Sequence, residues 1–175
     1  MTTATLTTTT NSSNLFDALL HGTDYNAIKK TMPLTSRTNA RMMAAVILDD
    51  GRDIRRMAKE GLDVTGVNLN GDTWLDVAVA RNRMKAAAAI IMLSRSKTAL
   101  LNETDANGDT VIDKAVGVVS ERFLVMLLSA SDNLNLLHKN SKNVSTLDLL
   151  MNLNSKRVND AMARNLTSTN MALAA

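Results

Sequence analysis

The chain has 175 residues, of which 45% are hydrophobic and only 2% aromatic, and its formal net charge is +3. This length allows one compact domain or a short array of repeats, and the absence of cysteine excludes disulfides, thiolate metal sites and a cysteine nucleophile. So small a net charge does not by itself indicate nucleic-acid binding. Small aliphatic side chains and a single proline favour closely packed helices over a β-sandwich.

The first segment of the chain is rich in threonine, serine and asparagine. Residues 1–13 offer little apolar surface to bury, so we expect them to form a disordered tail. They carry neither the basic nor the apolar region of a signal peptide, and no apolar run reaches membrane-spanning length. We therefore expect an intracellular, cytoplasmic protein without a membrane segment.

Helical patterns begin after this tail. Residues 14–33 have the pattern of a helix, a break and a second helix closed by proline, and residues 39–51 supply a further helix. Residues 53–60 predict a helix with an apolar face, and Gly61 ends it at a position that needs a left-handed backbone. Further on, the alanine run 86–89 has high helix propensity and lets neighbouring helices approach closely.

A short motif occurs twice in the middle of the chain. Asn-Gly-Asp-Thr spans residues 70–73 and returns at 107–110, an offset of 110 − 73 = 37 residues. Each copy continues into two apolar runs separated by a polar break, at Arg81–Arg83 and at Ser120–Arg122. A third, degenerate copy follows 147 − 112 = 35 residues after the second. A unit of turn, helix and helix is thus repeated.

Two short helices and an extended turn that recur every 33 to 37 residues resemble an ankyrin repeat array. The family motif Asn-Gly-x-Thr-Pro-Leu-His-x-Ala, followed by a Gly break and a Leu-Leu pair, is matched at Asn70, Gly71, Thr73, Leu75, Ala78, Asn82, Ile90 and Ile91. The next copy matches it at Asn107, Gly108, Thr110, Ile112, Ala115, Leu127 and Leu128. Residues 61–64 resemble the family's Gly-Ala-Asp-Val. Asn82 replaces the break glycine, since asparagine tolerates a positive φ better than most residues.

The resemblance covers residues 14–165 and implies an all-α fold. This fold is a short ankyrin-like helical solenoid of about four to five stacked helix pairs joined by extended turns, in which each pair buries its apolar side against its neighbours. Residues 166–175 are expected to form a frayed C-terminal tail. The chain departs from the motif where proline is replaced by Trp74, Val111 and Thr146, and histidine by Asp76, Asp113 and Asp148.

The repeated motif also has the outline of a calcium loop, with Asp105, Asn107 and Asp109 at the first, third and fifth positions. Thr110 stands where such a loop requires glycine, and Val116 where it requires a bidentate glutamate. We therefore interpret the motif as a turn that opens a helix. The sequence predicts no metal site and no cofactor.

No set of residues in the sequence has the spacing of a catalytic site. The recurring aspartates occur once per repeat, about 10 Å apart by helix packing distances, so they do not form an acid–base pair and instead suit helix N-termini. His21 and His138 are distant in sequence and lack partners, and no phosphate-binding or zinc motif is present. These observations argue against an enzyme.

Basic residues gather in two places, at 52–59 and at 81–85. Acidic residues interleave with the first group, which is typical of a solvated helix face with local ion pairs. Aromatic stacking residues are not interleaved with these basic groups, so the sequence argues against nucleic acid as the partner.

The resemblance implies a binding surface on the concave side, formed by the turn tips and the starts of the first helices. The contact positions carried over from the family are Asp72, Trp74, Asn82, Arg83, Asp109, Val111, Ser120, Val144 and Thr146. Two alternatives are open for Trp74: tryptophan is enriched among interface hot spots, but its indole could equally fold down over the neighbouring turn.

The sequence therefore predicts a non-catalytic protein-binding module whose partner is another protein. Two alternatives stay open: a structural or self-associating subunit of a larger assembly, and an effector from a virus or pathogen that inhibits a host protein by occupying it. The polar last helix resembles a capping repeat and favours a monomer or weak oligomer.

Overall fold

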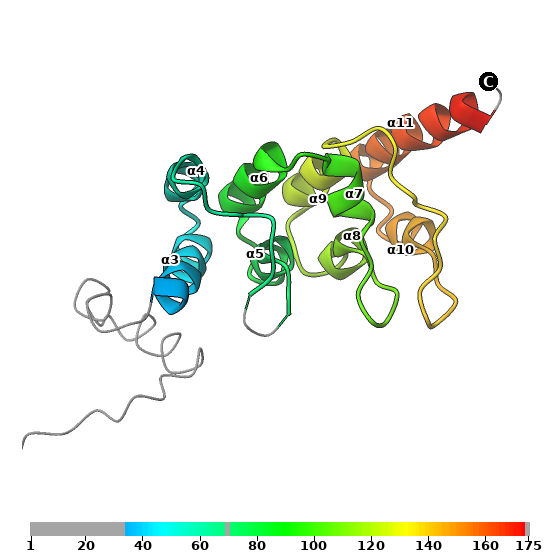
Figure 1. Ribbon diagram of the computed structural model, residues 1–175. Helices are drawn as coiled ribbons and strands as arrows, with labels where there is room; N and C mark the ends of the chain where they lie inside the picture. Colours follow the sequence, from blue (N-terminus) through cyan, green and yellow to red (C-terminus); the bar gives the residue numbers. More distant parts are fainter. Residues whose placement is uncertain (1–33, 69–70, 174–175) are drawn as a thin grey trace, which may run out of the picture.

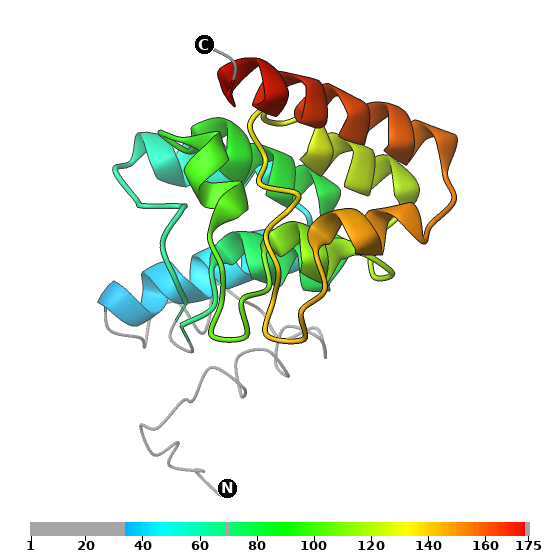
Figure 2. The ribbon, with the colours of Figure 1, turned by 90° about the vertical axis from the view of Figure 1, so that its right-hand side faces the viewer.

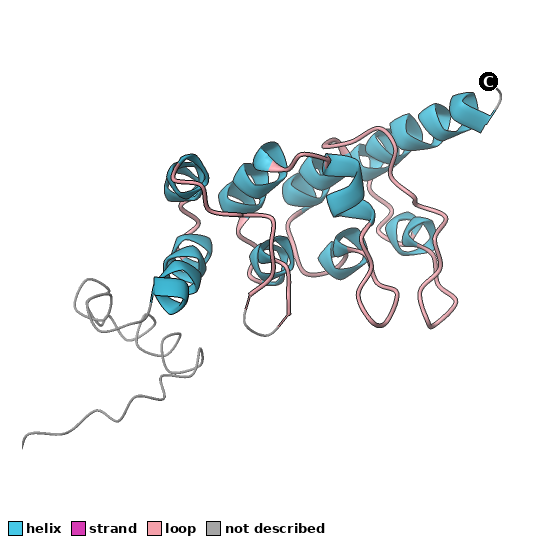
Figure 3. Cartoon of the chain, viewed as in Figure 1, coloured by secondary structure: helices cyan, strands magenta, loops and turns pink. Residues whose placement is uncertain are grey.

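The computed structural model describes residues 34–68 and 71–173. Within these ranges the chain is all-α, as the sequence predicts, and isolated bridges take the place of strands (Figure 3). The expected tail at 1–13 and the helices expected in 14–33 lie outside the described residues. The helices are α3 (Leu34–Ile47), α4 (Gly51–Lys59), α5 (Trp74–Ala80), α6 (Met84–Leu93), α7 (Lys97–Asn102), α8 (Val111–Ala115), α9 (Glu121–Leu128), α10 (Thr146–Met151) and α11 (Lys156–Leu173).

The helices form two rows (Figure 1). The first helices of four successive pairs, α3, α5, α8 and α10, pack side by side in one row. The second helices, α4, α6, α9 and α11, form the other row, and each contacts the first helix of its own pair. The short helix α7 lies between the two rows and contacts α6 and α8. Each pair thus buries its apolar side against its neighbours.

Three hairpin turns precede α5, α8 and α10 and lie along one side of the molecule (Figure 2). An antiparallel bridge closes each of them, between Val67 and Thr73, between Thr104 and Thr110, and between Lys139 and Ser145. The bridges repeat with offsets of 110 − 73 = 37 and 145 − 110 = 35 residues. The degenerate third copy of the motif therefore folds like the other two.

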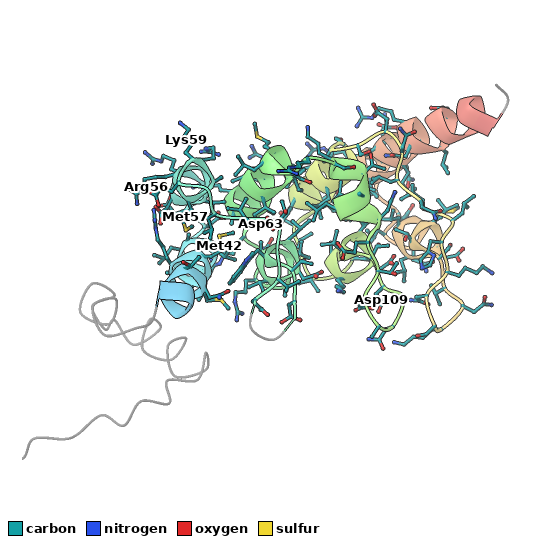
Figure 4. All side chains as sticks on the ribbon, viewed as in Figure 1. Met42, Arg56, Met57, Lys59, Asp63 and Asp109 are labelled. Atoms are coloured by element: carbon teal, nitrogen blue, oxygen red, sulfur yellow. The ribbon has the colours of Figure 1, made fainter. Side chains whose placement is uncertain are left out.

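Small side chains let the helices of the core approach closely. Ala86, Ala87 and Ala89 of α6 are fully buried, and the N-terminal end of α4 approaches the backbone of Lys85. Met42 and Met57 fill the junction of α3 with α4 (Figure 4). Because aromatic residues are scarce, the interior is built from aliphatic and methionine side chains at close helix spacing.

The first helix of each later pair begins with a hydroxyl cap. The Oγ atoms of Thr73, Thr110 and Ser145 accept hydrogen bonds from the backbone N–H three residues on, at 3.0, 3.2 and 3.1 Å. In the second and third copies the aspartate at that position accepts in return from the N–H of the cap residue, completing a capping box. The recurring aspartates are thus helix-start residues, as predicted.

Each connector between a first and a second helix contains one residue with positive φ. These residues are Asp49, Asn82, Gly117 and Asn154, with φ of 55°, 55°, 78° and 48°. Asn82 thus adopts the positive φ that the sequence predicts at this break. Two of these side chains also join neighbouring pairs: Asp49 Oδ1 accepts from Ala86 N at 2.8 Å, and Asn82 Oδ1 from Ser120 N at 3.4 Å.

The structure differs from the sequence predictions at two places. The linker at 94–106 contains the helix α7, which begins at the cap residue Ser96. Helix α11 continues to Leu173, so residues 166–173 do not fray as expected. This helix packs on α9, and its buried Asn165 donates to the Leu128 carbonyl at 2.9 Å, which ties the middle of the helix to the end of α9. None of the described helices combines the length and hydropathy needed to cross a bilayer.

Candidate functional site

The three hairpins share one pattern of hydrogen bonds. In each, an Asn or Asp side chain accepts from the backbone N–H four residues on: Asn68 Oδ1 from Asp72 at 3.0 Å, Asp105 Oδ1 from Asp109 at 3.0 Å, and Asn140 Oδ1 from Val144 at 3.1 Å. Gly71, Gly108 and Asn143 supply the positive φ that the turn needs. The repeated motif is therefore a turn held by its own backbone and one side chain.

This pattern also weighs against the calcium interpretation. Asp105 Oδ1 accepts from two backbone N–H groups, those of Asn107 at 2.8 Å and Asp109 at 3.0 Å, so the loop already uses this oxygen. Within the described ranges, no group of three or more candidate ligands is placed to hold a metal ion.

Asp72, Asp109 and Val144 lie on the hairpins, as the predicted binding surface requires. Asp72 is exposed, whereas Asp109 and Val144 are half-buried, and Figure 4 shows Asp109 on the second hairpin. The Asp109 carboxylate accepts from the Asn140 side-chain amide at 2.8 Å, which links the second hairpin to the third. Asp109 therefore has a structural function in addition to its place on the surface.

Trp74, Val111 and Thr146 are buried, with exposed fractions of 4%, 4% and 1%. They occupy the first positions of α5, α8 and α10, and their side chains turn into the chain's own interior. The prediction that these three residues contact a partner is corrected, because so little of each is accessible. For Trp74, the structure selects the alternative in which the indole folds inward.

Asn82, Arg83 and Ser120 lie in the connectors between first and second helices, away from the hairpin tips. Asn82 and Ser120 contact each other, and Ser120 caps α9 by accepting from Phe123 N at 3.4 Å. Arg83 is half-buried before α6. The predicted residues thus fall in two separate places, and the structure does not unite them in one site.

The contacts between the first and second hairpins differ from those between the second and third. Between the second and third, Ser141 N donates to Asn107 O at 2.9 Å, and His138 Nε2 lies 3.0 Å from Gly108 O. The residue equivalent to His138 one repeat earlier is Glu103 (138 − 35 = 103), whose carboxylate cannot donate to a carbonyl. A crevice of about 110 Å³ lies between the first two hairpins.

Lys114 lines this crevice together with Asp76 and Asp105. Its Nζ lies 3.1 Å from Asp76 Oδ1 and 3.2 Å from Asp105 Oδ2, which joins two repeats. Burial lowers the pKa of Lys114, but the hydrogen bonds and charges of Asp76 and Asp105 outweigh burial, so the pKa is raised. The lysine therefore stays protonated at neutral pH and acts as a tether.

We expect the fold to lose stability in acid. The Arg41 hydrogen bond holds the pKa of Asp53 below its usual value against the effect of burial, and Ser145 does the same for Asp148. A carboxyl whose pKa is lower in the folded chain than in the unfolded chain stabilises the fold above about pH 4. This contribution to stability is lost as the pH falls through the pKa of the folded state. Urea unfolding midpoints should therefore be flat between about pH 5 and 8 and fall below about pH 4.

The double variant Asp53→Asn/Asp148→Asn is the control for this prediction. It should unfold at a lower urea concentration at neutral pH and show a shallower loss in acid. A slope in acid equal to that of the wild type would contradict the assignment.

The sequence predictions did not include the exposed residues at the hairpin tips among the candidate binding residues. Asn107, Ser141 and Lys142 are exposed, and their backbones rather than their side chains take part in the turn hydrogen bonds. These residues can be identified because they lie between the two bridged residues of their hairpin. That identification requires knowing which residues form each bridge. We call the exposed hairpin residues that the structure describes, with the solvent side of α5, α8 and α10, the hairpin face.

The chain was also compared with known proteins. A scan against protein-family models finds no match, and a search of curated proteins finds no significantly similar sequence.

Proposed function

We propose that the described helix pairs form an ankyrin-like solenoid. The regular offsets of 37 and 35 residues between bridges, the shared hairpin hydrogen bonds and the two rows of helices support this proposal. In such an array each repeat contacts its neighbours, and insertions or substitutions at the tips leave the core unchanged.

We further propose that the protein is a non-catalytic binding module that engages another protein through the hairpin face. The observation that carries this proposal is that three hairpins lie on one side, and that Asn107, Ser141 and Lys142, at the tips of the second and third, expose side chains that the turns do not use. Side chains that a fold holds at regular intervals and does not need for its own hydrogen bonds are suited to recognition of a partner. An intracellular location would fit such a module.

The test is affinity capture with the immobilised protein from an extract of its native source. The wild type is compared with Asn107→Arg/Lys142→Glu at the tips and with Lys97→Glu on α7, an exposed position away from the hairpins. A protein captured by the wild type and the α7 variant, but lost at least about tenfold by the tip variant, would support the hairpin face.

Two outcomes would contradict the proposal. A partner retained equally by all three proteins would place binding elsewhere on the molecule. Defined oligomers in light scattering, with no captured partner, would favour the self-associating subunit.

A further inference from the structure

In each described helix pair, the second helix has a basic residue at its second position. These residues are Arg52 in α4, Lys85 in α6, Arg122 in α9 and Arg157 in α11, and all four are exposed. Their offsets of 33, 37 and 35 residues (85 − 52, 122 − 85, 157 − 122) follow the repeat. Because the second helices lie side by side in one row, these cations recur along one edge of the molecule.

This placement is locally unfavourable for the helices. The first turn of a helix presents unpaired N–H groups and the positive end of the helix dipole, so it favours acidic residues over basic ones. Arg52, Lys85 and Arg122 have no ion pair with any residue that the structure describes, and Arg157 pairs only with the exposed Glu121, at 3.5 Å. A feature that opposes local preference in four repeats, with little gain to the fold, indicates a use outside the fold.

The carboxylates near the start of this row, among the described residues, form no ion pair with Arg52 or Lys85. Asp50 accepts from the backbone N–H groups of Arg52 and Asp53, and Asp49 accepts from Ala86 N. Asp53 pairs with Arg41 of α3 and with Arg56. The acidic residues that interleave with residues 52–59 in sequence are therefore engaged by the fold, and the Asp53–Arg56 pair is one of the local ion pairs that the sequence predicts for this helix face.

Aliphatic side chains accompany the cations. Four residues before three of them lie Leu48, Val118 and Leu153, which are 74%, 51% and 39% exposed. A groove of about 850 Å³ opens between the starts of α4 and α6, lined by Leu48, Arg52 and Lys85 among others. The edge thus offers a cation and an apolar contact in most repeats.

We propose that this edge docks an extended segment of a partner protein that carries acidic and aliphatic residues. The edge is formed by Leu48, Arg52, Lys85, Val118, Arg122, Leu153 and Arg157. We call it the connector edge. Packed helices lie about 10 Å apart and an extended chain rises about 3.3 Å per residue, so a carboxylate at about every third residue would meet successive cations. The aliphatic residues of the segment would cover the exposed side chains between them.

The chemistry of the edge favours a protein segment over other anionic partners. Nucleic-acid phosphates would leave Leu48, Val118 and Leu153 without contacts, and the aromatic side chains that the structure describes, Trp74 and Phe123, are buried and cannot stack on bases. A segment of mixed acidic and aliphatic residues satisfies both kinds of group.

The connector edge is distinct from the hairpin face. The connectors lie at the opposite end of the first helices from the hairpins, as the last pair shows in Figure 2. The inference therefore does not rest on the proposed function, and either surface can bind without the other.

The test uses fluorescence anisotropy with a labelled peptide of repeating Glu-Glu-Leu, long enough to span about 30 Å. The wild-type chain is compared with Arg52→Gln/Lys85→Gln/Arg122→Gln and with Lys97→Gln/Lys139→Gln/Lys142→Gln, which removes the same charge elsewhere. We expect the first variant to weaken the Kd at least about tenfold and the second less than about twofold. Binding should also weaken as salt is raised.

Two further arms separate the alternatives. Leu48→Ser/Val118→Ser should reduce the affinity for the Glu-Glu-Leu peptide to that for a Glu-Glu-Ser peptide. Asn107→Arg/Lys142→Glu at the hairpin tips should leave the affinities for both peptides unchanged. Glutamine at the N-terminal turns of α4, α6 and α9 removes an unfavourable charge, so the first triple variant should stay folded, and circular dichroism checks both triple variants. Equal weakening by both triple variants, tighter binding to a DNA oligonucleotide or to phosphatidylserine vesicles, or no peptide binding would each overturn the proposal.

Discussion

Replacing Trp74 with alanine is expected to destabilise the fold by about 3–5 kcal/mol, the usual cost of removing a large aromatic side chain from a core. Trp74 is almost completely buried at the first position of α5, and its side chain belongs to the continuous core that joins the helix pairs. The cavity left behind would lie within this core, whose closely packed side chains cannot collapse fully into it. Urea denaturation followed by circular dichroism measures the effect as a lower midpoint at an unchanged slope.

The same variant distinguishes a core residue from a contact residue. At a temperature where both proteins are folded, Trp74→Ala should bind a partner with nearly unchanged affinity, because the indole offers almost no surface. Met92→Ala is a control for removing a large apolar side chain from an exposed position, and it should change stability by less than about 0.5 kcal/mol. Full stability combined with a large loss of partner affinity in Trp74→Ala would reverse the assignment.

The second large effect is expected for Gly51→Ala, which should destabilise the fold by about 1–3 kcal/mol. A β-carbon at this position would lie 2.6 Å from the carbonyl oxygen of Lys85 and 3.3 Å from the Ala89 side chain. Alanine favours a helix more than glycine does, so the local preference of α4 works in the opposite direction. The loss is nevertheless expected to dominate, because a backbone carbonyl inside a packed helix cannot move aside without shifting α6.

Gly66→Ala provides a matched control with the same chemical change. A β-carbon there would come no nearer than 3.4 Å to its closest neighbour, the Asp63 carboxylate, and the position has no positive φ. Stability should stay within about 0.5 kcal/mol of the wild type, or rise slightly because alanine restricts the unfolded chain. Equal urea midpoints for the two variants would show that α4 and α6 are packed less closely than the structure has them.

Several local features could be predicted from the sequence because a few neighbouring residues decide them. Gly61 and Asn82 adopt positive φ, and Thr73 and Thr110 cap helices, as their residue types and positions indicate. The 37-residue offset also reappears in the spacing of the bridges. Backbone conformation at such positions depends on the residue itself and on hydrogen bonds within about four residues, which a sequence shows directly.

The candidate site was less predictable, because exposure depends on residues far away in sequence. The family position of proline seemed to lie beside an exposed turn, but Trp74, Val111 and Thr146 turn inward there, since packing between repeats covers the start of each first helix. Helix α11 likewise runs to Leu173, beyond the point where composition alone predicted fraying, and its buried Asn165 joins it to the end of α9.

The sequence by itself determined the repeat, the helix boundaries that its caps and left-handed residues specify, and the all-α class, because these depend on residue type and spacing along the chain. Only the tertiary structure decided which side chains remain accessible and which charges remain unpaired. The acidic neighbours of Arg52 are close to it in sequence, yet Asp53 pairs with Arg41 of the neighbouring helix. Charge balance is set by distance in space, so the connector edge emerges only when the second helices lie side by side.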